Sequence, residues 1–161
     1  MRISKNGKVG RSPRPALLQS RAMRKLKNIT AILIDDNDTY RYLLAKSLHE
    51  IGIHILEDIR YISLKAMQGI VASNFVIMSY EKDPSATLKA MRYVKTKLKD
   101  AKIIISVCQE DKHSVPVDQL KQRGIDGLFY KADISQEELL AMVKAVMSGK
   151  DYFQNPTKTF F

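Results

Sequence analysis

Three positions in the sequence place polar side chains directly after apolar runs, where their chemistry can be combined. They supply an acidic pair, a hydroxyl and a lysine: Asp35 and Asp36, Ser79, and Lys131. A carboxylate beside a lysine forms an ion pair, and carboxylates at the start of a helix stabilise its N-terminus. These groups act together only if the fold brings them to one place.

Alternating apolar and amphipathic segments predict the elements that position these residues. Short apolar runs rich in β-branched residues are typical of parallel strands that are buried on both faces. We expect five of them, at 29–34, 51–56, 75–78, 102–108 and 127–130. Helical periodicity predicts five helices, near 40–48, 60–72, 85–99, 115–124 and 134–149.

This order predicts a doubly wound α/β fold, a three-layer α/β/α sandwich built on a five-stranded parallel sheet. In such sheets the functional residues lie at the carboxyl ends of the strands. The acidic pair, Ser79 and Lys131 all follow strand ends, so we expect them on one rim. The last helix has the clearest start, because Ser135 and Glu138 have the spacing of a capping box.

Net charge is concentrated in one segment of the chain. The 161 residues carry 27 Lys and Arg against 17 Asp and Glu, a formal net charge of +10. Residues 1–30 hold nine of these cations and no acid, which leaves about +1 for the rest. We therefore divide the chain into a basic, disordered tail at 1–28, a domain at 29–153 and a C-terminal tail at 154–161.

The basic tail has three interpretations. It is a solvated tail, with Met23 as an alternative true start, or an arm that contacts nucleic-acid phosphates, or a targeting segment. No aromatic residue lies among its cations, so base stacking has no support. No apolar run approaches the ~20 residues of a membrane span, and a single cysteine, Cys108, suits a reducing compartment. We expect a cytoplasmic protein with no membrane partner.

Three stretches of the sequence resemble the receiver domain of bacterial response regulators. They are ILIDDND at 32–38, GIDGLFYK at 124–131 and ISQEELLAMVKAVMSGKDYF at 134–153, and the resemblance covers 29–153. The last two are most similar to the NarL/LuxR-type subfamily, whose receiver precedes a helix-turn-helix domain. DYFQNP at 151–156 resembles the start of that subfamily's linker, although the helix-turn-helix domain does not follow it.

The resemblance implies a flavodoxin-like fold and phosphoryl transfer to an aspartate at the end of the third strand. In this family the acidic pair after the first strand holds a divalent cation, and a lysine after the fifth strand contacts the phosphoryl group. Asp35 and Asp36 match the pair, and Lys131 matches the lysine. The acceptor position holds Ser79, so the sequence resembles a degenerate receiver, or pseudo-receiver.

The loss of the acceptor changes what the remaining residues are expected to do. Because a ligand carboxylate is missing, we expect no required cofactor, with Mg²⁺ at Asp35 and Asp36 as the weaker alternative. We favour a structural ion pair between Lys131 and the acidic pair. Glu81 and Asp83 are alternative acceptors, but the buried third strand would have to slip by two to four residues to place either one correctly.

Two further positions of the family pattern each have several candidates. The candidates for the switch hydroxyl after the fourth strand are Ser106, Val107, Cys108 and Gln109. The candidates for an aromatic residue in the fifth strand are Phe129 and Tyr130. Residue counting does not choose among them.

These observations predict a non-enzymatic signalling module. We expect it to contact another signalling protein (a kinase, a regulator or a second copy) through the face made by the fourth helix, fifth strand and fifth helix. One alternative is a phosphorylatable receiver of a phosphorelay that uses Glu81 or Asp83. Another is a nucleic-acid-associated regulator that binds through the basic tail. An enzyme is disfavoured because no Gly-rich phosphate loop follows the first strand.

Overall fold

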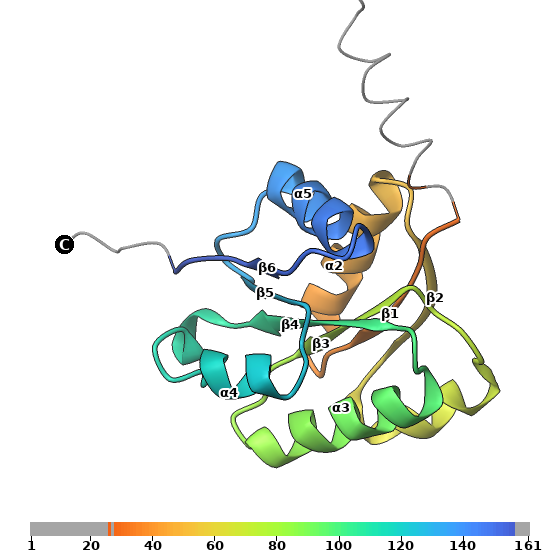
Figure 1. Cartoon of the computed structure of the whole chain (residues 1–161), viewed down its shortest axis with the longest axis horizontal. Helices are drawn as coiled ribbons and strands as arrows, with labels where there is room; N and C mark the ends of the chain where they lie inside the picture. Colours follow the sequence, from red (N-terminus) through yellow and green to blue (C-terminus); the bar gives the residue numbers. More distant parts are fainter. Residues whose placement is uncertain (1–25, 27, 157–161) are drawn as a thin grey trace, which may run out of the picture.

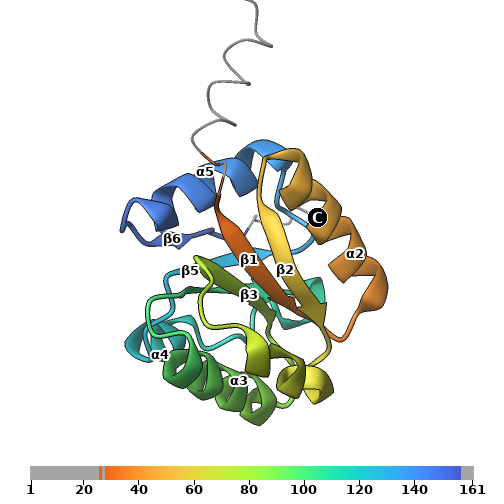
Figure 2. The ribbon, with the colours of Figure 1, turned by 90° about the vertical axis from the view of Figure 1, so that its right-hand side faces the viewer.

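The central sheet of the computed structural model has six parallel strands in the order β2-β1-β3-β4-β5-β6 (Figures 1 and 2). The strands are β1 (Thr30–Ile34), β2 (His54–Ile59), β3 (Phe75–Ser79), β4 (Lys102–Val107), β5 (Gly127–Tyr130) and β6 (Tyr152–Phe153). The chain winds outward in one direction from β1 to β2 and in the other from β3 onward. This is the doubly wound topology that the alternating pattern predicts.

Helices cover both faces of the sheet. They are α2 (Asp38–Glu50), α3 (Pro84–Lys97), α4 (Val117–Gln122) and α5 (Gln136–Met147), with 3₁₀ segments η1 (Tyr61–Gly69) and η2 (Gln109–Asp111). One apolar cluster packs α2 and α5 on one face, and another packs η1, α3 and α4 on the other. The expected three-layer α/β/α sandwich is therefore confirmed.

The structure describes Leu26 and residues 28–156. Nearly all of the basic tail, and residues 157–161, lie outside the described residues, so what the sequence predicts for them stays a prediction. No helix in the described part of the chain is both long and apolar enough to span a membrane.

Burial on both faces explains the continuous apolar runs. Ile32 and Ile34 of β1 point into the cluster under α3 and α4, whereas Ala31 and Leu33 point into the cluster under α2 and α5. Every residue of β3 and β5 is buried. A strand with this environment shows no alternation of polar and apolar residues.

Side-chain caps start α2 and α5, and the cap of α5 is the serine that the sequence predicts. Asn37 Oδ1 accepts a hydrogen bond from the Tyr40 amide at 2.9 Å. Ser135 Oγ accepts one from the Glu138 amide at 3.1 Å, which is half of the predicted capping box. The Glu138 carboxylate is used elsewhere, because it accepts a hydrogen bond from Gln154 Nε2 at 2.6 Å.

The second strand lies at His54–Ile59 and not at 51–56. Ile51 and Ile53 are buried in the turn after α2, and their amides both bond to the Leu48 carbonyl. Their apolar character therefore reflects packing in a turn and not membership of the strand.

The helix predicted over 60–72 is the 3₁₀ segment η1, which is interrupted by non-helical dihedral angles at Ser63. Its core-facing residues recur every three positions: Tyr61, Leu64, Met67 and Ile70. A period of three matches 3₁₀ geometry better than the α-helical period of 3.6.

A sixth strand adds to the five that the sequence predicts. Tyr152 and Phe153, which the sequence analysis took as the start of a linker, pair with Gly127 and Leu128. At Gly127 a Cβ atom would lie 3.2 Å from the Tyr152 carbonyl oxygen, so the absence of a side chain there permits the close approach. Strand β5 is therefore not an edge of the sheet.

Candidate functional site

A cleft of about 500 Å³ lies at the carboxyl ends of β1, β3 and β5. Its lining includes Asp35, Asp36, Ser79 and Lys131, so the fold brings the four predicted rim residues together. Most of the other charged residues that line it are acidic: Glu81, Asp83, Glu110 and Asp111. What this rim does depends on which of these groups are already bonded within the chain.

Asp35 and Lys131 form a largely buried ion pair across the rim. Lys131 Nζ lies 2.6 Å from Asp35 Oδ2, and the two side chains are 12% and 6% exposed. The other carboxylate oxygen of Asp35 accepts a hydrogen bond from the Asn37 amide at 2.8 Å. The ammonium also lies 4.5 Å from the centre of the Tyr40 ring, where it makes a cation–π contact. Both charged groups are thus committed within the chain.

Asp36 bonds to a different part of the chain from Asp35. Its side chain is exposed, and its Oδ1 accepts a hydrogen bond from the Tyr61 amide at 2.9 Å, which links the end of β1 to η1. The two aspartates therefore hold two different elements.

The donors at this rim do not fit a magnesium site. A hard divalent cation takes about six oxygen ligands, usually with carboxylates among them. Asp35 is occupied by the Lys131 ammonium, and Ser79, at the end of β3, supplies only a neutral hydroxyl. Within residues 28–156 no group of three or more His, Cys, Asp or Glu side chains is arranged to hold a metal ion.

Ser79 is the last residue of β3 and is 4% exposed. It pairs in register with Ser106 of β4, and every residue of β3 is buried. A slip of this strand would expose its core residues, so the register holds Ser79 at the end of β3. Glu81 and Asp83 lie beyond the strand.

Two side chains that the sequence analysis did not single out fix the turn after Ser79. The Tyr61 hydroxyl donates a hydrogen bond to the Ser79 carbonyl oxygen, and burial raises the pKa of Tyr61. Thr87 Oγ1, fully buried in α3, accepts a hydrogen bond from the Glu81 amide at 3.1 Å. In the sequence, the signal for the Thr87 contact is a threonine on the apolar face of a predicted helix.

The two alternative acceptors have different surroundings. Asp83 caps α3, because its Oδ1 accepts a hydrogen bond from the Ser85 amide at 3.0 Å. Hydrogen bonds from the Ser85 side chain and then from its amide lower the pKa of Asp83. Burial, together with the charges of Asp36 and Asp35, raises the pKa of Glu81. Asp83 is committed to a helix start, whereas Glu81 is the partly buried carboxyl group of the cleft.

Cys108 is the candidate for the switch position whose side chain lines the cleft. Val107 is fully buried in the core, and Ser106 and Gln109 do not belong to the lining. The Cys108 thiol lies 2.9 Å from Asp111 Oδ2, and burial followed by this bond raises its pKa. The group is therefore a protonated thiol, without the electropositive surroundings of a reactive cysteine.

The two aromatic candidates in β5 lie on opposite faces of the sheet. Phe129 packs in the cluster under α2 and α5, and Tyr130 packs in the cluster under α3 and α4. Lys112 Nζ lies 5.8 Å from the centre of the Tyr130 ring and 2.9 Å from Asp133 Oδ2. Tyr130 is thus the aromatic residue on the side of the loop that follows β4.

Gln154 fastens the C-terminal segment to the loop between β5 and α5, which begins with the rim lysine. Its Oε1 accepts a hydrogen bond from the Tyr130 amide at 2.8 Å. Its Nε2 donates to the Asp133 carbonyl at 3.1 Å and to Glu138 Oε2 at 2.6 Å. Its backbone N–H donates a hydrogen bond to the Leu128 carbonyl at 2.9 Å. The sequence analysis assigned this residue to a tail, and no local pattern indicates its role.

Comparison with known proteins gives matches among solved structures alone, since no family model and no curated protein matches the chain. The receiver domain of RcsB from Salmonella enterica serovar Typhimurium, with phosphomimetic BeF3−, has a TM-score of 0.65 at 16% identity over 80% of this chain and 94% of that one. The non-phosphorylated RcsB receiver domain from Escherichia coli has 0.65 at 16%, over 80% and 99%. The receiver domain of NarL from Mycobacterium tuberculosis has 0.62 at 15%, over 77% and 99%.

A longer RcsB chain, solved as two dimers bound to two parallel DNAs, is also similar. Its TM-score is 0.65 at 17% identity, and the match covers 80% of this chain but 64% of that one. The chain therefore spans less than two thirds of that protein. At these identities the similarity establishes the fold alone, which is the α/β fold of receiver domains.

Proposed function

We propose that the chain is a non-catalytic signalling module of the response-regulator receiver type, which acts by protein contact and not by phosphorylation of an aspartate. The observation that carries the proposal is Ser79 at the end of β3, where the resemblance implies an acceptor aspartate, beside a rim closed by the ion pair of Lys131 and Asp35. On this account the chain is a pseudo-receiver that keeps the fold without the reaction.

The closed pair makes phosphoryl transfer unfavourable in a second way. A phosphoryl group at the rim requires a cation and an available lysine to neutralise its charge. Lys131 already neutralises Asp35 at 2.6 Å, and breaking a buried pair by removing one partner costs about 3–5 kcal/mol. An incoming phosphoryl group would therefore have to break the contact between Lys131 and Asp35 before Lys131 could contact it.

The phosphorelay alternative then rests on Glu81. Asp83 is engaged in capping α3, and a raised pKa makes the Glu81 carboxylate less available than an ordinary one. Glu81 also follows the strand end by two residues, where the backbone has already turned toward α3. Acceptance of phosphate by Glu81 is therefore the second candidate function.

The proposed partner is another signalling protein, a kinase, a regulator or a second copy, at the face formed by α4, β6 and α5. The face expected from the sequence, helix 4, strand 5 and helix 5, is altered because β6 covers the outer edge of β5. Lys121 of α4 lies 4.3 Å from the centre of the Phe153 ring, so α4 and β6 form one continuous surface. Nucleic-acid binding through the basic tail stays an alternative.

The acceptor proposal is tested by incubating the full chain with acetyl phosphate and Mg²⁺ and measuring intact mass. We expect no acid-labile phosphate on the wild-type chain. Stoichiometric acid-labile phosphate that disappears in Glu81→Gln, but not in Asp83→Asn, would establish the phosphorelay alternative instead. Phosphate lost in Asp83→Asn alone would also contradict the proposal.

The partner face is tested by using the full chain to capture binding proteins. The double variant Lys121→Glu and Glu137→Lys reverses two exposed charges on α4 and α5 without changing net charge. Its matched control, Lys65→Glu and Glu50→Lys, makes the same exchange at exposed positions of η1 and α2. We expect the first variant to lose the partner and the second to retain it, and equal capture by both would remove this face from the proposal.

A further inference from the structure

The outward face of α3 is a cationic surface, whereas the cleft at the carboxyl ends of the strands is acidic. The helix buries Thr87, Ala90, Met91 and Val94 against the sheet. The exposed hydroxyls and cations on its opposite face and just beyond its end are Ser85, Lys89, Arg92, Thr96 and Lys99, and the exposed Asp100 follows directly. From Pro84 to Lys97 the helix contains no acidic residue.

The cations of this face are not neutralised within the described part of the chain. The six ion pairs seen there include neither Lys89, Arg92 nor Lys99. Lys95, which flanks the face, donates a hydrogen bond to the backbone carbonyl of Arg123 and so makes no ion pair either. By contrast, the lysine of the carboxyl-end rim is paired with a buried carboxylate.

The end of α3 lies at the edge of the sheet where β1 and β4 start. Asn74 connects the two places, because its Oδ1 accepts a hydrogen bond from the Thr30 amide at 2.8 Å and its carbonyl accepts one from the Lys102 amide at 2.9 Å. Thr30 starts β1 directly after the tail, and Lys102 starts β4 shortly after α3. Figure 1 shows the start of β1 and the end of α3 toward the same end of the sheet.

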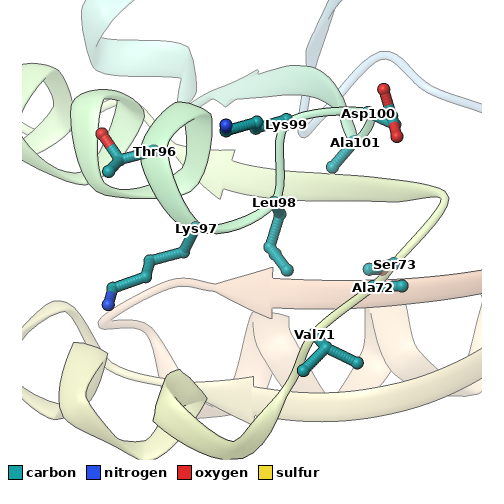
Figure 3. A pocket seen from close by; sticks show the side chains of 9 residues that line it. All are labelled: Val71, Ala72, Ser73, Thr96, Lys97, Leu98, Lys99, Asp100 and Ala101. Atoms are coloured by element: carbon teal, nitrogen blue, oxygen red, sulfur yellow. The ribbon is translucent and has the colours of Figure 1, made fainter.

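The pocket at this end of the sheet is not arranged to bind a small anion. It has a volume of about 280 Å³ and is lined partly by the segment from Thr96 to Ala101 (Figure 3). Figure 3 shows the side chains of Lys97 and Lys99 pointing in different directions, with Asp100 at the far side. The lysines do not converge on one point, so the charge acts as an extended surface and not as a cage for a small anion.

We propose that the outward face of α3 contacts the phosphate backbone of a nucleic-acid duplex. Arginine, lysine, serine and threonine are the side chains that commonly contact phosphates. The helix rises about 10.5 Å from Lys89 to Thr96, which is the axial length of about three base pairs.

The residue types on the outward face of α3 also limit what this surface can bind. The face of α3 has no aromatic side chain for stacking on bases, so we expect binding that is independent of nucleotide sequence. It has no apolar side chain among Ser85, Lys89, Arg92, Thr96 and Lys99, whereas a helix that binds a membrane surface buries an apolar face. A duplex is therefore favoured over a lipid surface.

The test measures the affinity of the full chain for short DNA duplexes of two unrelated sequences over a range of salt concentrations, by fluorescence anisotropy. The triple variant Lys89→Gln, Arg92→Gln and Lys99→Gln removes three exposed charges. Its matched control removes three exposed charges on α2, on α5 and beyond α5: Lys46→Gln, Lys144→Gln and Lys150→Gln. Each lost phosphate contact lowers the slope of log affinity against log salt by about 0.9, so we expect a fall of about 2.7 for the first variant alone.

A third variant replaces the nine cations of residues 1–27 by glutamine. If it abolishes binding while the α3 variant keeps the wild-type affinity and salt slope, the tail acts alone and the α3 proposal is wrong. Equal losses in the α3 variant and its control, or binding to phosphatidylserine vesicles without binding to duplexes, would overturn it as well. None of these results bears on whether the rim accepts phosphate, so the proposed signalling function is tested separately.

Discussion

The carboxyl-end rim and the outward face of α3 show that the number of charges in a region does not decide what the region can do. The rim is rich in carboxylates, yet Asp35 is bonded to Lys131, Asp36 to the amide of residue 61, and Asp83 to the start of α3. The α3 face has fewer charged residues, but they make no ion pair in the described part of the chain.

The difference lies in the partners of each charge. A buried charge that is paired contributes to the folded state and is costly to separate, whereas an exposed, unpaired charge is free to meet an external ligand. We therefore assign a structural role to the rim and a binding role to α3. The following predictions test the two assignments, beginning with the largest effect.

Replacing Lys131 by methionine should destabilise the chain most. The substitution keeps an aliphatic side chain but leaves the Asp35 carboxylate buried without its partner, so we expect a loss of about 3 kcal/mol in the free energy of unfolding. Urea denaturation at neutral pH measures it. Lys144→Met at an exposed position of α5 is the control and should change stability by less than about 0.5 kcal/mol. A loss no larger than the control's would mean that the rim pair has no structural role.

Replacing Gln154 by alanine should have the next largest effect. It removes the side-chain hydrogen bonds to the Tyr130 amide, the Asp133 carbonyl and the Glu138 carboxylate, and we expect a loss of about 1–3 kcal/mol. Hydrogen exchange should accelerate at the Tyr130 amide and in β6. Asn155→Ala changes an exposed neighbour and serves as the control. Unchanged exchange at Tyr130 in the Gln154 variant would show that the C-terminal segment is not fastened as described.

How well the sequence predicts the structure depends on how far apart in the chain the interacting residues lie. Buried strands such as β3 and β5 are visible as apolar runs, and the rule of carboxyl ends correctly gathers Asp35, Ser79 and Lys131 at one cleft. Apolar residues over 60–72 predict an α-helix, whereas the residues of this segment that face the core recur every three positions, as in the 3₁₀ segment η1. Strand β6 has two residues, too few for any period to show.

The bonding within the site was less predictable than its composition. The hydrogen bonds of Tyr61 to Ser79 and of Gln154 to Tyr130 join segments about 18 and 24 residues apart. Such contacts depend on the final packing of the elements and leave no local pattern. The pairing of Lys131 with Asp35 could be anticipated because both follow strand ends and carry opposite charge.

The smallest predicted effect concerns Asp38, at the exposed edge of the rim. Hydrogen bonds from Arg60 and then Arg41 lower the pKa of Asp38 from 3.8 to about 2. A carboxyl group whose pKa is depressed in the folded state stabilises it above the ordinary pKa, and this contribution is lost as the pH falls from about 4 toward 2. In Arg60→Gln, NMR titration of the carboxyl carbon should show the pKa of Asp38 rising toward 3.8.

The control for this titration is Arg92→Gln, which removes an exposed arginine from α3 and should leave the pKa of Asp38 unchanged. If Asp38 titrates near 3.8 in the unmodified chain, the arginines do not hold it, and the pairing at this edge of the rim is wrong.

The central claim, that the rim is closed to phosphoryl chemistry, is tested most directly by NMR of the full chain with Mg²⁺ and beryllofluoride, a mimic of the phosphoryl group. We predict that the amide signals of Asp35, Asp36, Ser79 and Lys131 keep their positions when both are added. Saturable shifts of these signals, with Lys131 released from Asp35, would show that the rim accepts the phosphoryl mimic and would contradict the account.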